Sequence, residues 1–299
     1  MNTQGIFHKT LKRDLRKIIT DKDVMMQGTR VREIFGMSNM TDAYDDDQVY
    51  GGIGRADEQT EGANITIGSV TQGPSFRWKA RKYGKRMIVT DEALEDCKYK
   101  EAIKGAKRCV RAVVKGAEYE GALFFDRSFD TNYLFGDGVP LCSASHPLAV
   151  GGTFSNIFAT PMAPSVAAYA QARTQALGFP SHDGLIDSVD VKGVIFPKEQ
   201  LTEWQVITGS KLETSENNFS RLNVAERANL KLMMNQYITA SVTNYWFKTD
   251  SMDGIDFRVR RKMRSRTWSE NANETVHYSC TMRWAFGHNE PRNIIGVGS

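Results

Sequence analysis

A long helical stripe of apolar residues between residues 91 and 125 constrains the fold of this chain most strongly. The stripe consists of Ile103, Ala106, Val110, Val113, Ala117 and Phe124, which recur with the helical period. An unbroken helix over this range would span roughly 52 Å. A compact globule of this length has a radius of gyration near 19 Å and hence a diameter of only about 50 Å. The sequence therefore predicts a flat, elongated subunit built around a helical spine.

The residue at the start of this helix favours helix formation, whereas three glycines in its interior disfavour it. Thr90 is suited to cap the first turn. Gly105, Gly116 and Gly121 each cost up to about 1 kcal/mol in a helix interior. A bend or a break in the helix is therefore left open.

Length and hydropathy bound the class of protein. The 299 residues suffice for one large domain or two medium ones. No apolar run reaches the roughly 18 residues of a membrane helix, and the first residues lead into a charged segment rather than an apolar one. We expect neither a membrane span nor a signal peptide.

Charge is small in sum but unevenly distributed. The net charge is +4, yet residues 77–86 and 258–266 each hold six basic residues and no acid, whereas residues 42–61 hold seven acids against one arginine. These clusters are either solvated faces or strips on neighbouring subunits that meet and fix register. Nucleic-acid binding is a third interpretation, which neither a recognition motif nor a strong basic excess supports.

An extended hairpin is predicted over residues 65–83. Aromatic residues at 76 and 78 alternate with basic residues at 77, 79 and 81. Because an isolated two-stranded ribbon is only marginally stable in water, we expect its aromatic side to dock on another surface, that of a neighbouring subunit. The candidate inter-subunit contacts are Phe76, Arg77, Trp78, Lys79, Arg81, Asp45, Asp46 and Asp47.

Shorter patterns predict the remaining elements. These are an amphipathic helix in an arm at 8–19, loop or extended arm at 36–62, helices at 165–177 and 201–209, a strand at 190–196, a polar loop at 217–229, and strands at 255–260 and 276–286. The mixture between about residues 145 and 245 indicates a separate α+β lobe. One side of the last strand is expected to pack on the long helix.

Residues 136–156 gather a serine, a histidine and an aspartate in one turn-rich stretch. The prolines and glycines around them predict two tight turns about a short extended piece. A hydrolase using Ser143 or Ser145 with His146 is the alternative, but known triads draw their groups from distant parts of the chain. No nucleophile elbow, phosphate loop, dinucleotide fingerprint or metalloprotease motif occurs. We therefore expect no catalytic residue.

Metal and cofactor sites are not expected either. The four cysteines, at 97, 109, 142 and 280, are too widely spaced for a Cys-x-x-Cys motif and are expected to be reduced and buried. Cys142 with His146, and His277 with Cys280, offer two ligands each, whereas zinc needs three or four. The aspartates at 45–47 lack the alternating spacing and the glycine of a calcium loop.

Several segments in the same order resemble the major capsid proteins of tailed bacteriophages, including Mu-like major head subunits. The most specific is Ser-Ala-Ser-His-Pro-Leu-Ala at 143–149, preceded by Asp-Gly-Val-Pro-Leu at 137–141 and followed by Gly-Gly-Thr-Phe-Ser-Asn at 151–156. Val-Thr-Asp-Glu at 89–92, Val-Ile-Phe-Pro at 194–197 and Tyr-Trp-Phe at 245–247 also resemble that family. The resemblance covers about residues 46–299, with Cys142 at a position where an aromatic is more usual.

This resemblance implies an α+β fold of the Hong Kong 97 type. Its parts would be an N-terminal arm at 1–45, an extended β-hairpin loop at 46–86 that reaches over an adjacent subunit, a peripheral domain with the spine helix at 87–142, an α+β axial domain at 143–245, and the C-terminal strands of the peripheral domain at 246–299.

The function that it implies is structural rather than enzymatic. Such a protein self-assembles as hexamers and pentamers into an icosahedral head shell, assembled in the host cytoplasm, that becomes part of the virion. Its implied partners are packaged double-stranded DNA bound without sequence specificity, a portal, and decoration, cement or scaffold proteins, with no membrane and no cofactor. An encapsulin-like compartment with the same fold is the nearer alternative, and the hydrolase is the more distant one.

Overall fold

A computed structural model describes residues 29–298 except 63, 91, 94–98, 213–221, 240–241, 252–253 and 271–273. The chain divides into two compact units. Within the described residues, unit 1 comprises 29–44, 79–121 and 257–286, and unit 2 comprises 45–78, 122–256 and 287–298. The predicted loop segment 46–86 is thus shared between the units. The predicted helix at 8–19 and Cys97 lie outside the described residues.

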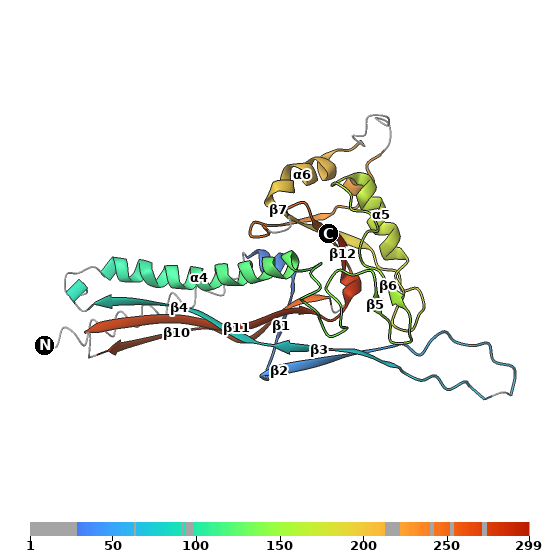
Figure 1. Cartoon of the computed structure of the whole chain (residues 1–299), viewed down its shortest axis with the longest axis horizontal. Coiled ribbons are helices and arrows are strands. Elements are labelled where there is room, and N and C mark those ends of the chain that lie inside the picture. Colours follow the sequence, from blue (N-terminus) through green and yellow to red (C-terminus); the bar gives the residue numbers. More distant parts are fainter. Residues whose placement is uncertain are drawn as a thin grey trace. The chain divides into compact units, whose positions relative to one another are not determined.

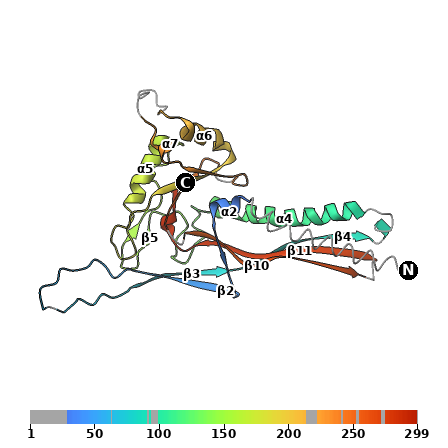
Figure 2. The same cartoon turned by 180° about the vertical axis from the view of Figure 1, so that it is seen from behind.

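Unit 1 contains a four-stranded sheet with a helix along one face (Figures 1 and 2). The strand order is β1 (Gly36–Asn39), β10 (Ile255–Glu270), β11 (Thr275–His288) and β4 (Arg81–Thr90). The period-two patterns near residues 255 and 276 therefore predicted their strands correctly. A short helix, α2 (Arg30–Ile34), buries Val31 and Ile34.

The long helix α4 (Tyr99–Asp126) is continuous through its three glycines. Its 28 residues correspond to about 42 Å. A Cβ at Gly105 would lie only 2.7 Å from the sulfur of Met87 in β4, and one at Gly121 would lie 3.2 Å from the Phe35 ring. These two glycines allow neighbouring elements to approach the helix closely, which offsets their low helix propensity.

Aromatic side chains fill the core between the helix and the sheet. Tyr83 of β4 stacks on Trp284 of β11 with ring centroids 4.1 Å apart. Phe286 contacts both Phe257 and Phe35, at 4.8 Å each. Further along the sheet, Val276 of β11 clusters with Ala102 of α4. The predicted packing of the last long strand on the helix is confirmed.

Unit 2 is built on a second four-stranded sheet in the order β12 (Ile294–Val297), β9 (Tyr245–Thr249), β7 (Val191–Pro197) and β8 (Lys231–Asn235). β7 pairs in parallel with β8, and the other pairs are antiparallel. Strands β7, β9 and β12 are buried almost continuously, as in sheets covered on both faces. The covering helices are α5 (Val166–Leu177), the 3₁₀ turn η1 (Lys198–Gln200), α6 (Leu201–Gly209) and α7 (Val224–Arg227).

Helix ends in unit 2 follow local capping chemistry. The Ser165 hydroxyl accepts a hydrogen bond from the Ala168 amide at 3.1 Å and starts α5 as predicted. Helix α7 corrects the prediction of a loop at 217–229. The Asn223 side chain caps it by accepting from the Ala225 amide at 2.9 Å, but four residues are too few to show a helical period.

The predicted hairpin at 65–83 is wrong in its pairing. Strand β3 (Gln72–Lys79) pairs with β2 (Tyr44–Tyr50), in a region that we expected to be loop or extended arm, and the described residues between them form no strand (Figure 2). Pro74 lies inside β3, as an edge strand permits. The pattern of β2 was hidden because its more buried positions include Asp45 and Asp47, which are not apolar.

Candidate functional site

The root of the β2–β3 ribbon, formed by Asp47 of β2 and by Phe76 and Trp78 of β3, is fastened to the last residue of β11 and the residue after it. The indole nitrogen of Trp78 donates a hydrogen bond to Asn289 Oδ1 at 2.9 Å, and the Asn289 amide donates to Asp47. The Phe76 ring lies 5.2 Å from the His288 ring. These contacts tie both strands of the ribbon to one dipeptide.

The structure corrects the role expected of the two ribbon aromatics. Phe76 and Trp78 are each only 3% exposed and are covered within unit 2. A side chain that its own chain already covers has no apolar surface left to bury on another subunit. The prediction that this pair anchors on a neighbour is therefore wrong.

The charged ribbon candidates are distributed differently. Arg77 donates two hydrogen bonds to Asp46, at 2.7 and 2.6 Å, and this contact lowers the pKa of the Asp46 carboxyl. Asp45 lies in the same strand as Asp46, on its more buried side. Lys79, the last residue of β3, and Arg81, the first residue of β4, are exposed, and neither takes part in the ion pair between Arg77 and Asp46. A role of these residues in inter-subunit contacts stays a prediction.

The connection between β2 and β3, residues 51–71, exposes apolar side chains. Ile65 and Ile67 are 83% and 96% exposed, and Ile53 and Val70 are also largely exposed. Acidic residues at 57, 58 and 61 are exposed in the same segment. The segment is closed at its base, where the Gly51 amide donates to the Thr71 carbonyl at 2.7 Å. We call residues 51–71 the β2–β3 loop; it presents apolar and acidic groups together.

One face of the unit 1 sheet carries basic charge. Met87 of β4 lies next to Gly105 of α4, so the odd-numbered residues of β4 face the helix. The even-numbered residues, Lys82 and Arg86 among them, lie on the opposite face. In the register of β4 with β11, Ile88 pairs with His277 and therefore shares this face.

Strand β10 extends this basic face. The Trp268 ring stacks on His277 with centroids 5.1 Å apart, so Trp268 and the residues that alternate with it lie on the same face. The exposed cations of the basic face are Lys82, Arg86, Lys262, Arg264 and Arg266. Strands β4 and β11 and residues 257–269 of β10 contain no aspartate or glutamate. This face is suited to contact an acidic surface.

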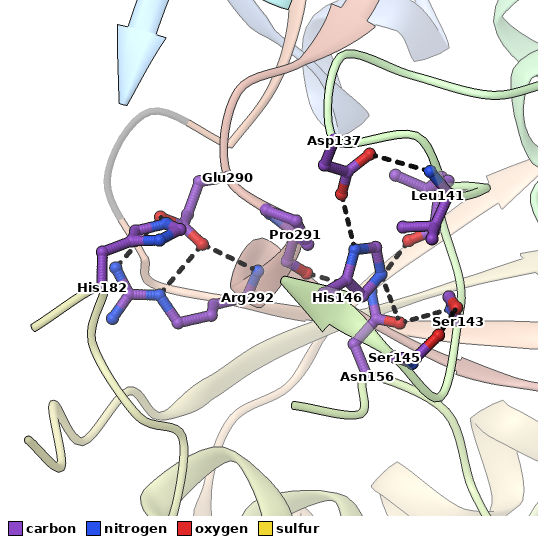
Figure 3. Close-up of polar contacts among 11 residues, drawn as sticks. Asp137, Leu141, Ser143, Ser145, His146, Asn156, His182, Glu290, Pro291 and Arg292 are labelled. Atoms are coloured by element: carbon purple, nitrogen blue, oxygen red, sulfur yellow. Dashed lines mark hydrogen bonds and ion pairs between the residues drawn. The ribbon is translucent and has the colours of Figure 1, made fainter. Parts of the chain in front are cut away.

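A buried polar cluster organises the turn-rich stretch (Figure 3). His146 Nδ1 lies 2.7 Å from Asp137 Oδ2, and His146 Nε2 lies 3.1 Å from Asn156 Oδ1. The Asn156 amide donates to the carbonyls of Leu141 at 2.8 Å and Pro291 at 3.1 Å. Because these two bonds fix the orientation of the amide, its oxygen is an acceptor and His146 Nε2 donates to it.

The hydrogen bonds of His146 are those of a structural cluster rather than of a catalytic triad. In a serine hydrolase the ring nitrogen opposite the aspartate faces the nucleophile. Here that nitrogen binds Asn156, and the hydroxyls of Ser143 and Ser145 lie 3.5 Å from each other (Figure 3). The predicted tight turns are confirmed, since the two-residue strands β5 (His146–Pro147) and β6 (Thr153–Phe154) pair with each other.

A second polar cluster lies nearby in unit 2 (Figure 3). Glu290 accepts from Arg292 Nε at 2.9 Å and from Nη2 at 3.0 Å, and His182 Nε2 lies 3.3 Å from Glu290 Oε2. Burial raises the pKa of Glu290, but the close contact with His182 and the hydrogen bonds from Arg292 outweigh it and lower the pKa to about 2. Arg292 also reaches Asp187 at 3.1 Å. The cluster fixes the short turn η2 (Pro291–Asn293).

Cysteine and metal chemistry are limited in the described part of the chain. Cys109, Cys142 and Cys280 are buried free thiols, and burial raises the pKa of Cys142 to about 12. Among the described residues, no group of three or more His, Cys, Asp or Glu side chains is placed to hold a metal ion. Within the same residues, no helix has the length and apolar character needed to cross a membrane.

Solved structures of capsid proteins and capsid-like particles share this fold. The virus-like particle from Pyrococcus furiosus matches with a TM-score of 0.55 and 10% identity, over 96% of this chain and 98% of that one. The capsid of an empty GTA particle matches with a TM-score of 0.53 and 14% identity, over 89% and 88%. The chain has a capsid-protein fold. A solved structure from Mycobacterium phage Cain also matches, with a TM-score of 0.52 and 13% identity, over 87% of this chain and 83% of that one.

Sequence comparison adds nothing to this capsid-protein fold, since no family model and no curated protein matches the chain. The resemblance drawn from short segments is confirmed at the level of the fold. The polar partners Asp137 and Asn156 stand in two of those segments, but sequence reasoning assigned them no role. The sequence feature that could have indicated this role is the concentration of hydrogen-bonding side chains in a stretch with two prolines.

Proposed function

We propose that this chain is the major capsid protein of a tailed bacteriophage, of the Mu-like major head type with a Hong Kong 97-type fold. Its function is self-association, as hexamers and pentamers, into an icosahedral shell that encloses DNA. The capsid-protein fold shared with several capsids and a virus-like particle supports this proposal. The role is structural, with no reaction and no cofactor.

The observation that carries the proposal is the exposure of Ile65 and Ile67 on the β2–β3 loop. Fully burying one isoleucine side chain contributes about 1.5–3 kcal/mol. A second copy of the chain that covers the loop recovers this free energy. Because each subunit of a closed shell makes several such contacts, the linked contacts reinforce one another through effective concentration.

Charged side chains fix the register of these contacts between copies of the chain. The acidic side chains of the β2–β3 loop and the exposed Asp46 of β2 match the basic face of the unit 1 sheet in a second copy. Complementary charges select the partner and the register more than they add affinity. Such contacts weaken as salt rises, since exposed charges are screened within about 10 Å at 0.1 M ionic strength.

The other proposed partners are those of a phage head. The shell packages double-stranded DNA without sequence specificity and joins a portal, and decoration, cement or scaffold proteins act on the same shell. Assembly takes place in the host cytoplasm, and the product is the capsid of the virion. The contacts proposed here require no membrane.

The decisive experiment removes the apolar side chains of the β2–β3 loop. The double variant Ile65→Ser/Ile67→Ser is expected to give a soluble, folded subunit that no longer forms closed particles in negative-stain electron microscopy. The matched control is Ile186→Ser, which alters an isoleucine that is similarly exposed but lies outside the loop. An unchanged yield of particles from the double variant contradicts the proposal.

An encapsulin-like compartment is the second candidate. It is favoured by the match to a virus-like particle over nearly the full length of both chains. Purified particles distinguish the two functions. A phage head yields nuclease-protected double-stranded DNA and associates with a portal, whereas a compartment yields an enclosed protein cargo.

A further inference from the structure

The side chain of His288, the last residue of β11, is buried. It is 1% exposed, and its ring packs against Phe135 at 4.3 Å and Phe76 at 5.2 Å between centroids. In the described part of the chain, neither ring nitrogen has a hydrogen-bond partner. His146, by contrast, has a partner on both nitrogens. An unpartnered buried polar group calls for an explanation beyond packing.

The surroundings of His288 disfavour a charged ring. From β3 it meets the apolar Phe76, and the ionisable groups that act on it are Asp137, His146 and Glu290. Asp137 is already paired with His146, and Glu290 with Arg292. Burial lowers the pKa of His288 to about 4, against the smaller opposing effects of Asp137 and Glu290.

The position of His288 couples its charge to the ribbon. Asn289, the next residue, bonds both Trp78 of β3 and Asp47 of β2. Phe76 of β3 lies against the histidine itself. A movement that brings the His288 ring to water must therefore disturb the contacts that hold both strands of the ribbon.

We infer that His288 is an acid-sensitive latch: while its ring is neutral, it holds the root of the β2–β3 ribbon in place, and protonation from solvent releases the ribbon. The closed form keeps its full stability above the ordinary histidine pKa of 6.5 and loses it as the pH falls towards about 4. Between pH 6.5 and about pH 4.5, the equilibrium for opening the root rises roughly 40-fold.

Hydrogen exchange of the full-length, unassembled chain measures this opening. Exchange of the amides in β3 (Gln72–Lys79) is compared with that of the amides in β7 (Val191–Pro197) in the same sample, which removes the intrinsic effect of pH. In the unchanged chain the ratio is expected to rise roughly 40-fold over this pH range. In His288→Leu, whose side chain is apolar and does not titrate, the ratio is expected to rise only a few-fold.

Two further measurements keep the test decisive. His277→Gln, which changes a buried histidine of unit 1, should preserve the acid response of β3. Direct titration of the His288 ring by NMR in the unchanged chain tests the latch even when His288→Leu fails to fold. Equal acid responses of the unchanged chain and His288→Leu, or a His288 ring that titrates near 6.5, overturn the inference. Because both readouts use unassembled protein, neither depends on the proposed shell function.

Discussion

The indole N–H of Trp78 donates a hydrogen bond to the side-chain oxygen of Asn289, 2.9 Å away and 211 positions later in the chain. This single contact decides which part of the ribbon is available to other molecules. It lies at the root of the ribbon, where the side chains of Phe76 and Trp78 are buried by other parts of the same chain. The surface left for partners is the β2–β3 loop beyond it.

Replacing Asn289 by alanine is expected to loosen the ribbon root. The change removes the hydrogen bond that the buried indole of Trp78 donates to Asn289 and the bond from Asn289 to Asp47, which should lower the free energy of unfolding by about 2 kcal/mol. Urea unfolding of the full-length chain measures this. Asn132→Ala, at an exposed site outside the root, is the control and should change stability by no more than about 0.5 kcal/mol. Equal stabilities of the two variants would show that the root contact is unimportant.

Asn156→Ala should be among the most damaging substitutions in unit 2. It leaves two carbonyls, the Ser143 amide and His146 Nε2 without their partner in a fully buried site. We expect a loss of about 3 kcal/mol or more, measured by denaturant unfolding or seen as insoluble expression. The double variant Ser143→Ala/Ser145→Ala should fold and assemble normally, because neither hydroxyl bonds the histidine. A loss of some hydrolytic activity in that double variant would revive the enzyme alternative.

Glu290→Gln should destabilise unit 2 in a pH-dependent way. The pKa of Glu290 is lowered from 4.5 to about 2, so its carboxylate stabilises the fold above pH 4.5, and this contribution is lost as the pH falls to about 2. The difference in unfolding free energy between the unchanged chain and the variant is expected to be on the order of 3 kcal/mol at neutral pH and to shrink between those two values. A difference that is independent of pH would mean that the carboxylate charge does not matter.

Two glycine-to-alanine changes should have opposite signs. A Cβ at Gly136 would collide with the backbone of Ser75 in β3, which cannot move aside easily, so Gly136→Ala should cost about 1–3 kcal/mol. Gly116 lies inside α4 with no atom within 4 Å of an added Cβ, so Gly116→Ala should stabilise by roughly 0.5–1 kcal/mol. Thermal unfolding of both variants checks the pair. A stabilising Gly136→Ala would show that the turn is not packed on β3.

Charge reversal tests the pairing of the β2–β3 loop with the basic face. Arg264→Glu/Arg266→Glu should reduce particle yield at low salt by 10-fold or more, since like charges across an interface repel strongly. Adding Asp57→Lys/Glu58→Lys to the same chain should restore much of the yield. Rescue by this second pair is the expected result, measured by sedimentation of assembled particles. If the reversed loop gives no recovery, another surface receives the loop.

Sequence patterns predicted the elements with the strongest periods. Strands β7, β10 and β11 and helices α5 and α6 occur where apolar alternation or helical spacing is clear. Strand β2 was missed because the more buried positions of its period fall largely on aspartates, which a hydrophobicity pattern does not register. Helix α7 is too short to have a pattern at all.

The candidate site was predicted less well for a physical reason. Alternation at 76 and 78 shows that one side of a strand is covered, but it does not show what covers it. The cover is the segment that begins at His288, more than 200 residues away, and no local signal connects the two. The exposed isoleucines of the loop led to the opposite error. Their alternation at 65 and 67 predicted a strand, but the described residues of the loop form none.

Strand β4 lies at the edge of its sheet and holds four cations in ten residues, namely Arg81, Lys82, Lys85 and Arg86. An edge strand offers unpaired backbone groups, which can template runaway pairing with other chains. A chain that self-associates in many copies, as we propose for this one, is especially exposed to that hazard. The electrostatic repulsion between two such edges would keep newly made subunits from forming amorphous precipitates while leaving them free to meet an acidic counterpart.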